Sequence, residues 1–141
     1  MPKVYRTMKM EDGLPIVGST RTSLGVRVGV DISPDFEDNV HPRAGSMSVM
    51  SSVYPPIPSL IPKRLRETDP RYAGGTAPED SFIFSYGNGD FVDGSLSENL
   101  AVRIDKSWHA LVEPSSSMAL KDYTDALEAT RDEWAVAEEK R

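Results

Sequence analysis

The chain has 141 residues, of which 38% are hydrophobic and 27% charged, with a formal net charge of -6 and no cysteine. This length predicts one domain over residues 1–141 and excludes two catalytic domains of ordinary size. No run approaches the roughly 18 apolar residues of a membrane span, and the N-terminus lacks a signal-peptide pattern. The absence of cysteine excludes disulfides, thiolate zinc sites and cysteine nucleophiles. We therefore expect a protein that is made and acts in the cytoplasm, without membrane or metal partners.

Negative charge is concentrated in the C-terminal half. Residues 1–70 carry nine Lys and Arg against eight Asp and Glu, whereas residues 71–141 carry seven against fourteen. An acidic surface repels phosphate backbones at long range. The basic run "KRLRETDPR" at 63–71 is the one exception, and we interpret it as a solvated loop. The charge pattern therefore argues against a nucleic-acid-binding protein.

Alternation of apolar and polar residues predicts strands through most of the chain up to residue 113. We expect strands at 3–8, 24–32 and 46–53, a hairpin of 81–86 with 91–95 around an Asn-Gly turn, and a second hairpin of 99–104 with 107–113. A rigid, proline-rich loop is predicted at 54–62, and an irregular binding loop or lid from 63 to 81.

The last segment has the period of a helix. Between residues 118 and 134 an apolar stripe recurs at three- and four-residue steps and can pack on a sheet; it comprises Leu120, Tyr123, Leu127, Thr130 and Trp134. Ser116 or Ser117 is placed to cap the start of this helix.

Arg6 is the clearest anomaly of the first strand, because it shares a face with Val4 and Met8. A buried guanidinium is costly unless it meets a carboxylate, a phosphate or a cluster of carbonyl groups. An internal ion pair explains it as well as a ligand does. The alternation of "SMSV" gives a second polar feature, because it lines one strand face with Ser46 and Ser48.

Arg27 lies between Gly25 and Gly29 on the polar face of the strand predicted at 24–32. Glycine weakens a strand unless a bulge, a bend or a close approach needs the space. The two glycines therefore indicate either room beside a cation or a solvent-facing edge with a bulge.

The common catalytic motifs are missing. The sequence contains no G-x-S-x-G, H-E-x-x-H, Walker loop or G-x-G-x-x-G. His109 and Glu113 share a strand face, but four residues of strand separate their Cα atoms by about 13 Å. They cannot form a hydrogen-bonded dyad within that strand, and a lone strand histidine is more often structural than catalytic.

Five segments carry a resemblance to a known family: "VYRTM", "TSLGVRVGVDI", "HPRAGSMSV", the "GGT" loop and "HALVEPSSSMALKDYTDALEATRDEW". Together they resemble a group of small bacterial toxins related to an NAD-dependent, ADP-ribosyltransferase-like effector of the type VI secretion system. The resemblance implies a compact α+β fold with a split, mixed or antiparallel sheet, an NAD-binding cleft and a C-terminal helix packed on the sheet. It also implies delivery into a target cell without a classical signal peptide.

The resemblance also implies roles for particular residues. Arg6 would hold the dinucleotide, Ser46 and Ser48 would shape the nicotinamide pocket, and either Glu113 or His109 would act near the reacting ribose. The assigned NAD-binding set is Tyr5, Arg6, Arg27, His41, Ser46, Met47 and Ser48, and the assigned catalytic set is Arg6, Ser46, His109 and Glu113.

The implied function is a toxin that transfers ADP-ribose from NAD to an unknown macromolecular target or hydrolyses NAD. A cognate immunity or antitoxin protein would neutralise it. The alternative is a non-enzymatic immunity or binding protein of a toxin system, which the acidic C-terminal half suits at least as well.

Overall fold

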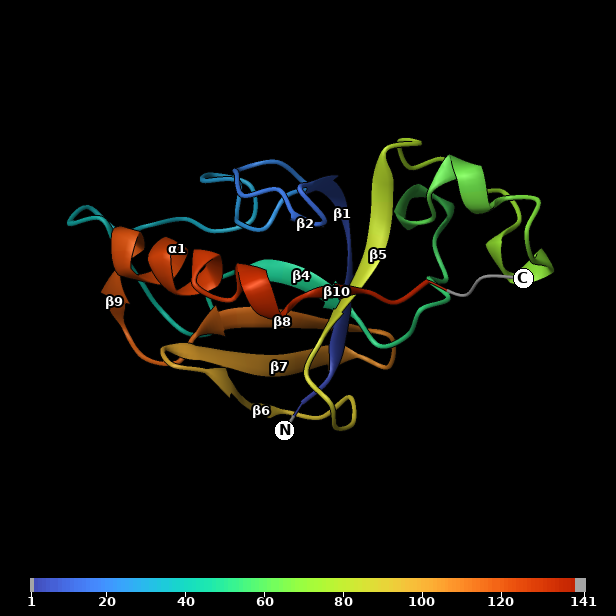
Figure 1. The fold of residues 1–141 in the computed structure, drawn as a ribbon. Helices are drawn as coiled ribbons and strands as arrows, with labels where there is room; N and C mark the ends of the chain where they lie inside the picture. Colours follow the sequence, from blue (N-terminus) through green and yellow to red (C-terminus); the bar gives the residue numbers. More distant parts are fainter. Residues whose placement is uncertain (1, 139–141) are drawn as a thin grey trace.

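The computed structural model describes residues 2–138 and shows a mixed α+β protein with a curled antiparallel sheet and one C-terminal helix (Figure 1). The strands are β1 (Val4–Glu11), β2 (Leu14–Pro15), β3 (Asn39–Val40), β4 (Met47–Met50), β5 (Ser81–Tyr86), β6 (Gly94–Ser97), β7 (Leu100–Lys106), β8 (His109–Pro114), β9 (Met118–Ala119) and β10 (Ala135–Val136). The helix α1 is Leu120–Glu128, and the 3-10 turns are η1 (Pro58–Leu60), η2 (Lys63–Leu65), η3 (Pro70–Tyr72) and η4 (Arg131–Glu133).

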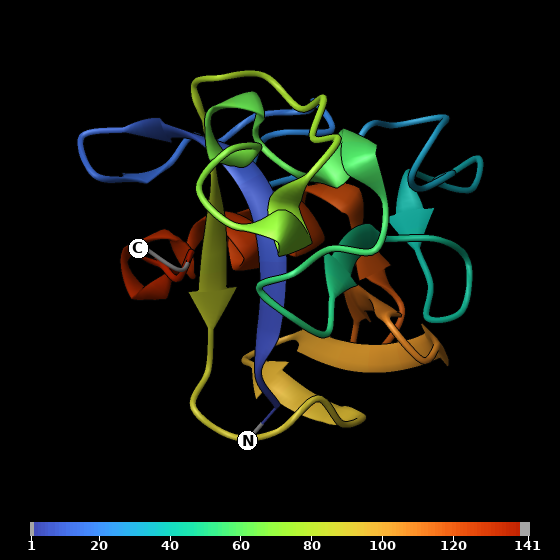
Figure 2. The same cartoon turned by 90° about the vertical axis from the view of Figure 1, so that its right-hand side faces the viewer.

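The main sheet divides into two parts that run in different directions. Its strand order is β10-β5-β1-β4-β8-β7-β6, with β2 added to β1, while β3 and β9 form a separate pair. Figures 1 and 2 show β1 and β5 crossing the direction of β7 and β8. β1 pairs with β5 from Val4 to Lys9, but it meets β4 at the single pair Tyr5 and Met50. The sheet is therefore split between β1 and β4.

Both faces of β1 are covered. Val4 and Met8 are fully buried in the main core, where they pack with side chains from α1 and the other strands. Tyr5, on the opposite face, packs against a second apolar cluster formed with the 61–72 segment. This second cluster comprises Met50, Ile61, Leu65, Tyr72 and Ile83. The proline-rich and irregular segments thus cover one face of β1 and β5, and their 3-10 turns are the short elements that the sequence pattern missed.

The strand predicted at 24–32 is wrong, although its apolar pattern is partly kept. Leu24, Val26 and Ile32 are buried, whereas Val28 and Val30 are exposed and the segment makes only isolated bridges. Gly29 has a φ of +85°, and the N–H of Arg27 is bound by the Asp31 side chain. This local turn reverses the chain and breaks the alternation.

The predicted hairpin of 81–86 with 91–95 is also wrong. β5 pairs with β1 and β10, and β6 pairs with β7 instead. Gly87 has a φ of +91°, and a Cβ there would lie 2.0 Å from the carbonyl oxygen of Pro2. At Gly87 the chain therefore packs closely against the N-terminal segment, and it does not fold back to pair with β5. The second predicted hairpin is confirmed as β7 and β8, with its turn two residues later than expected.

The C-terminal helix is confirmed, but it is shorter than its apolar stripe. α1 ends at Glu128, and the stripe continues through buried Thr130 into η4 and buried Trp134. The residue at its N-cap is Ala119, without a side-chain cap, so the serine cap is wrong. Among residues 2–138 no helix is long and apolar enough to cross a membrane.

Tyr123 fixes α1 to the sheet. Its hydroxyl donates to the Val112 carbonyl at 2.5 Å and accepts the Met47 N–H at 3.2 Å. Met47 and Val112 face each other across β4 and β8, so one hydroxyl ties the helix to both strands. Burial raises the pKa of Tyr123 to about 12, so the hydroxyl stays protonated and keeps its donor.

We expect Tyr123→Phe to lower the free energy of unfolding by about 1–3 kcal/mol, because it removes a buried hydrogen bond to each of two strands. Tyr5→Phe is the matched control, since no described residue hydrogen-bonds to the Tyr5 hydroxyl. Urea denaturation of both variants measures the difference, and equal stabilities would contradict the anchoring role.

Candidate functional site

A cavity of about 260 Å³ lies where β1 and β4 separate. Cationic, hydroxyl and aromatic residues lie on its wall together with apolar ones. Its lining comprises Arg6, Thr7, Arg21, Arg27, Asp31, Ser48, Val49, Met50, Ile57, Ser59, Leu60, Trp108 and His109. Four residues of the predicted site therefore meet here, namely Arg6, Arg27, Ser48 and His109.

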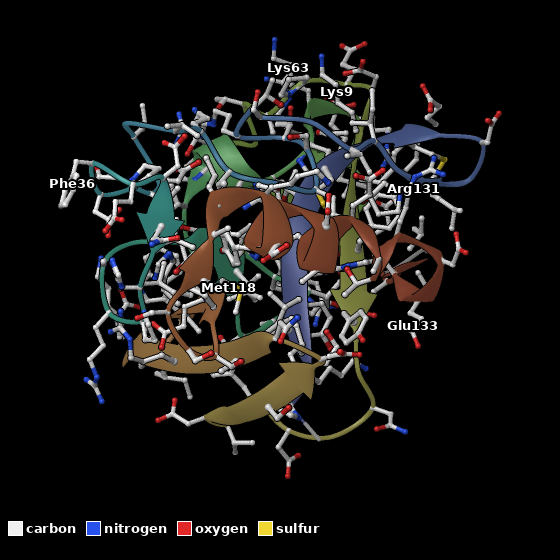
Figure 3. All side chains as sticks on the ribbon, turned by 90° about the vertical axis from the view of Figure 1, so that its left-hand side faces the viewer. Lys9, Phe36, Lys63, Met118, Arg131 and Glu133 are labelled. Carbon is white, nitrogen blue, oxygen red and sulfur yellow. The ribbon has the colours of Figure 1, made fainter. Side chains whose placement is uncertain are left out.

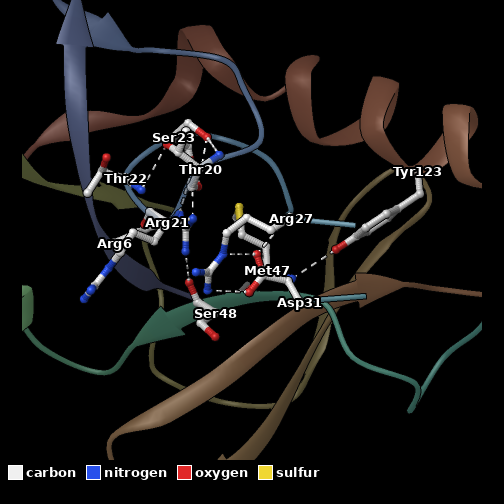
Figure 4. A network of polar contacts seen from close by, with 10 residues as sticks. All are labelled: Arg6, Thr20, Arg21, Thr22, Ser23, Arg27, Asp31, Met47, Ser48 and Tyr123. Carbon is white, nitrogen blue, oxygen red and sulfur yellow. Dashed lines mark hydrogen bonds and ion pairs between the residues drawn. The ribbon is translucent and has the colours of Figure 1, made fainter. Parts of the chain in front are cut away.

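Arg6 closes the split in the sheet through backbone carbonyl groups (Figure 4). Its Nη1 donates to the Ser48 carbonyl on β4 at 2.6 Å. Nε and Nη2 donate to the Ser23 carbonyl at 3.1 and 2.9 Å, and Nη2 also reaches the Arg21 carbonyl at 3.3 Å. The guanidinium thus links β1, β4 and the 18–32 loop.

The sequence left open whether Arg6 meets a carboxylate, a phosphate or a cluster of carbonyl groups. In the structure its partners are backbone carbonyl groups, and Arg6 is 7% exposed. Four of the five guanidinium N–H groups are used in this way, which leaves one for a ligand. Burial lowers the pKa of Arg6 to about 10, with the Asp31 carboxylate opposing the shift, so the side chain remains a cation at neutral pH.

Arg21 and Arg27 have more N–H groups available than Arg6. Arg27 uses Nε and Nη2 in contacts to Asp31 of 3.1 and 2.9 Å, and its side chain is 40% exposed. Arg21 is exposed and makes one long contact to the Ser59 carbonyl, at 3.5 Å. Partial burial raises the pKa of Asp31, but hydrogen bonds and charge from Arg27 outweigh this and leave that pKa below its usual range. The cavity thus combines one ionised carboxylate with three cations.

Gly25 does not leave space for a ligand beside Arg27, whereas Gly29 has open space around it. A Cβ at Gly25 would lie 1.9 Å from the Gly18 carbonyl oxygen, and Gly29 serves the turn. Gly25 thus permits the close approach of two backbone segments in the loop that Arg6 holds.

Three predicted site residues face away from the cavity. Ser46 is 2% exposed, and its hydroxyl donates to the adjacent Gly45 carbonyl. Met47 is part of the main core, and Tyr5 belongs to the second apolar cluster. Ser46 and Ser48 therefore do not form one hydroxyl-lined wall, because Ser48 alone lines the cavity.

His41 lies outside the cavity and joins two loops at the β3–β9 pair. Its Nε2 is 2.8 Å from Asp35 Oδ2 and its Nδ1 is 2.7 Å from Ser117 Oγ. Val40 pairs with Met118, so this contact extends the short ladder by one residue on each side. Phe36, beside Asp35, is 96% exposed and projects from this edge (Figure 3).

Glu113 is also outside the cavity. It is buried on β8, where Oε1 accepts from Arg103 Nε at 2.8 Å and from the Arg43 N–H at 3.1 Å. The structure therefore does not bring Glu113 to Arg6 or His109.

The sequence interpretation missed Arg21, Asp31 and Trp108 as cavity residues. The predicted strand at 24–32 put Asp31 on the same face as Arg27, but that strand does not form, and a local turn brings the two side chains together. Trp108 precedes His109, and alternation predicts that one of the two points into the core, whereas both line the cavity. Arg21 had no local signal, since a folded loop brings it there.

Within residues 2–138 no group of three or more His, Asp or Glu side chains is placed to hold a metal ion. Comparison of the chain with known protein families, curated proteins and solved structures found no match. The function is therefore argued from the cavity together with the sequence resemblance.

We expect Arg6→Ala to destabilise the fold by about 3 kcal/mol or more, because it leaves three backbone carbonyl groups without their donor. Arg6→Lys should recover part of the loss, since an ammonium is a point charge that cannot match the guanidinium fork. Thermal and urea denaturation measure the effect.

Arg66→Ala is the control for this prediction, because Arg66 is exposed and its side chain makes no hydrogen bond or ion pair to a described residue. It should change stability by less than about 0.5 kcal/mol. A folded Arg6→Ala protein with unchanged stability would show that the carbonyl contacts contribute little.

Proposed function

We propose that the cavity binds NAD and that the protein is a toxin that cleaves the nicotinamide-ribose bond, either hydrolysing NAD or transferring ADP-ribose to a macromolecular target. The observation that carries the proposal is the cluster of Arg6, Arg21 and Arg27 at the split in the sheet, with Trp108 and His109 on the same cavity wall. The sequence resemblance described above points to the same ligand.

The chemistry of the wall suits a dinucleotide. Arg21 and Arg27 can donate charge-assisted hydrogen bonds to phosphate oxygens, with Arg27 held in place by Asp31. The Ser48 hydroxyl suits a ribose, and Trp108 offers an aromatic face for a base. The volume is slightly below that of ordinary small-molecule sites, so the cavity accommodates one nucleoside half of NAD and leaves the other half outside.

Loss of nicotinamide from NAD develops an oxocarbenium-like ribose, and catalysis therefore depends on positioning and electrostatic stabilisation. In this proposal Arg6 has a different role from the one implied by the resemblance. It holds the 18–32 loop next to β4 beside the ligand, while Arg21 and Arg27 contact the phosphates. A cognate immunity protein restrains the toxin in the cell that makes it.

A second candidate function has its own structural observation. A groove of about 470 Å³ runs between the β6–β7 connection and α1, and its charged lining residues are all acidic. They are Glu98, Asp122, Asp125 and Glu133. Such a groove suits a basic segment of another protein, as expected of a non-enzymatic immunity or binding protein.

NAD should raise the melting temperature of the wild-type protein, since a ligand that binds the folded state stabilises it. We expect Arg21→Gln to weaken NAD binding about tenfold or more, because a hydrogen bond to a charged group is worth roughly 1.5–3 kcal/mol. Arg66→Gln should bind like wild type. Titration calorimetry checks both, and a wild-type protein that ignores millimolar NAD would exclude the NAD proposal.

Expression in a bacterial host separates the two candidates. A toxin of the proposed kind should arrest growth and deplete cellular NAD when produced without its partner, and Arg21→Gln should relieve the arrest. An immunity or binding protein should leave growth and the NAD pool unchanged. Normal growth with a constant NAD pool would therefore favour the binding protein.

A further inference from the structure

Asp105 and His109 form a close pair at the β7–β8 hairpin beside the cavity. Asp105 Oδ1 lies 2.6 Å from His109 Nδ1, and the two side chains are 30% and 16% exposed. The ladder shifts register between Ile104 and Lys106, both of which have partners on β8, so Asp105 is the extra residue of a β-bulge. Bulges re-aim side chains and are frequent next to active sites.

This contact sets the chemistry of the imidazole. With Nδ1–H donated to Asp105, the neutral ring carries its lone pair on Nε2. No described residue hydrogen-bonds to Nε2. The Trp108 ring meets the imidazole edge-on, with centroids 5.2 Å apart, and so restricts the ring from a second side. His109 is therefore oriented by two neighbours and keeps one acceptor atom free.

The carboxylates are less suited than His109 to accept a proton at the cavity. Asp31 lines it, but Arg27 donates three hydrogen bonds to its two oxygens and holds its pKa below the usual range, which makes it a weak base. Glu113 lies outside the cavity and is bound by Arg103 and the Arg43 N–H. Among the cavity residues that the structure describes, His109 is thus the side chain best placed to accept a proton.

We infer that His109 is the general base of the proposed reaction and that Asp105 is its positioning residue. The inference rests on the proposed function. A hydroxyl nucleophile gives its proton to His109 Nε2 while its oxygen bonds to C1′ of the ribose. The bond from C1′ to the nicotinamide nitrogen breaks, and its electron pair neutralises the pyridinium charge of the departing nicotinamide. The nucleophile is a water molecule or a hydroxyl group of an acceptor.

The test measures nicotinamide release and NAD affinity on the same full-length proteins. Replacing His109 by Gln, which cannot accept a proton, should lower kcat roughly 10²- to 10⁴-fold, the range of general acid–base catalysis. Asp105→Asn should lower kcat at least tenfold and leave KM and the NAD dissociation constant within threefold of wild type. Asp132→Asn, an exposed carboxylate change on η4, is the matched control and should retain full activity.

Two further readouts separate chemistry from folding. Added imidazole should restore part of the activity of His109→Gly, which a structural role for His109 does not predict. Asp105→Glu, which keeps a carboxylate, should have a higher kcat than Asp105→Asn. If free ADP-ribose and nicotinamide form in equal amounts, the nucleophile is water. If less free ADP-ribose forms and the remainder is found attached to added bacterial macromolecules, the nucleophile is an acceptor hydroxyl.

The failures are distinguishable. A wild-type protein that neither binds NAD nor releases nicotinamide would overturn the proposed function and this inference with it. A wild-type protein that cleaves NAD, with wild-type kcat in His109→Gln and Asp105→Asn, would overturn the inference alone.

Discussion

The guanidinium of Arg6 lies at the point where β1 and β4 separate, and it provides hydrogen bonds that the divided ladder cannot. β1 meets β4 at one residue pair, and the Ser48 carbonyl next to that pair is bound by Arg6. The same side chain binds the carbonyls of residues 21 and 23, so the position of the 18–32 loop depends on it. Buried backbone carbonyls are costly without a donor, and a guanidinium presents several donors from one residue.

This arrangement separates two uses of arginine in one cavity. Arg6 is buried and nearly saturated by the backbone, so it shapes the cavity. Arg21 and Arg27 are more exposed and have N–H groups to spare, so they suit an anionic ligand better. Asp31 positions Arg27 and also lies close enough to Arg6 to affect its pKa. The loop held by Arg6 thus supplies the other charged groups of the cavity.

The two histidines each contact an aspartate, but their locations give these contacts different roles. Each lies within hydrogen-bond distance of an aspartate, at 2.8 Å for His41 and 2.6 Å for His109. His41 has Ser117 on its other nitrogen and joins the β3 and β9 segments at an exposed edge. His109 has no described partner on its other nitrogen and lines the cavity. A histidine and an aspartate in the sequence do not distinguish these two cases.

The sequence by itself determined the elements whose cause is local. Alternation identified β1 with its buried Arg6 and the β7–β8 hairpin, and the helical period identified the buried stripe of α1. Tertiary structure alone decided that residues 24–32 form a loop, that β5 pairs with β1, and that Arg21 and Asp31 join Arg6 while Ser46 and Glu113 do not. The physical reason is the range of the contacts: Arg6 binds carbonyl groups 15 to 42 residues away, and alternation describes which face a residue takes but not which segment comes to meet it.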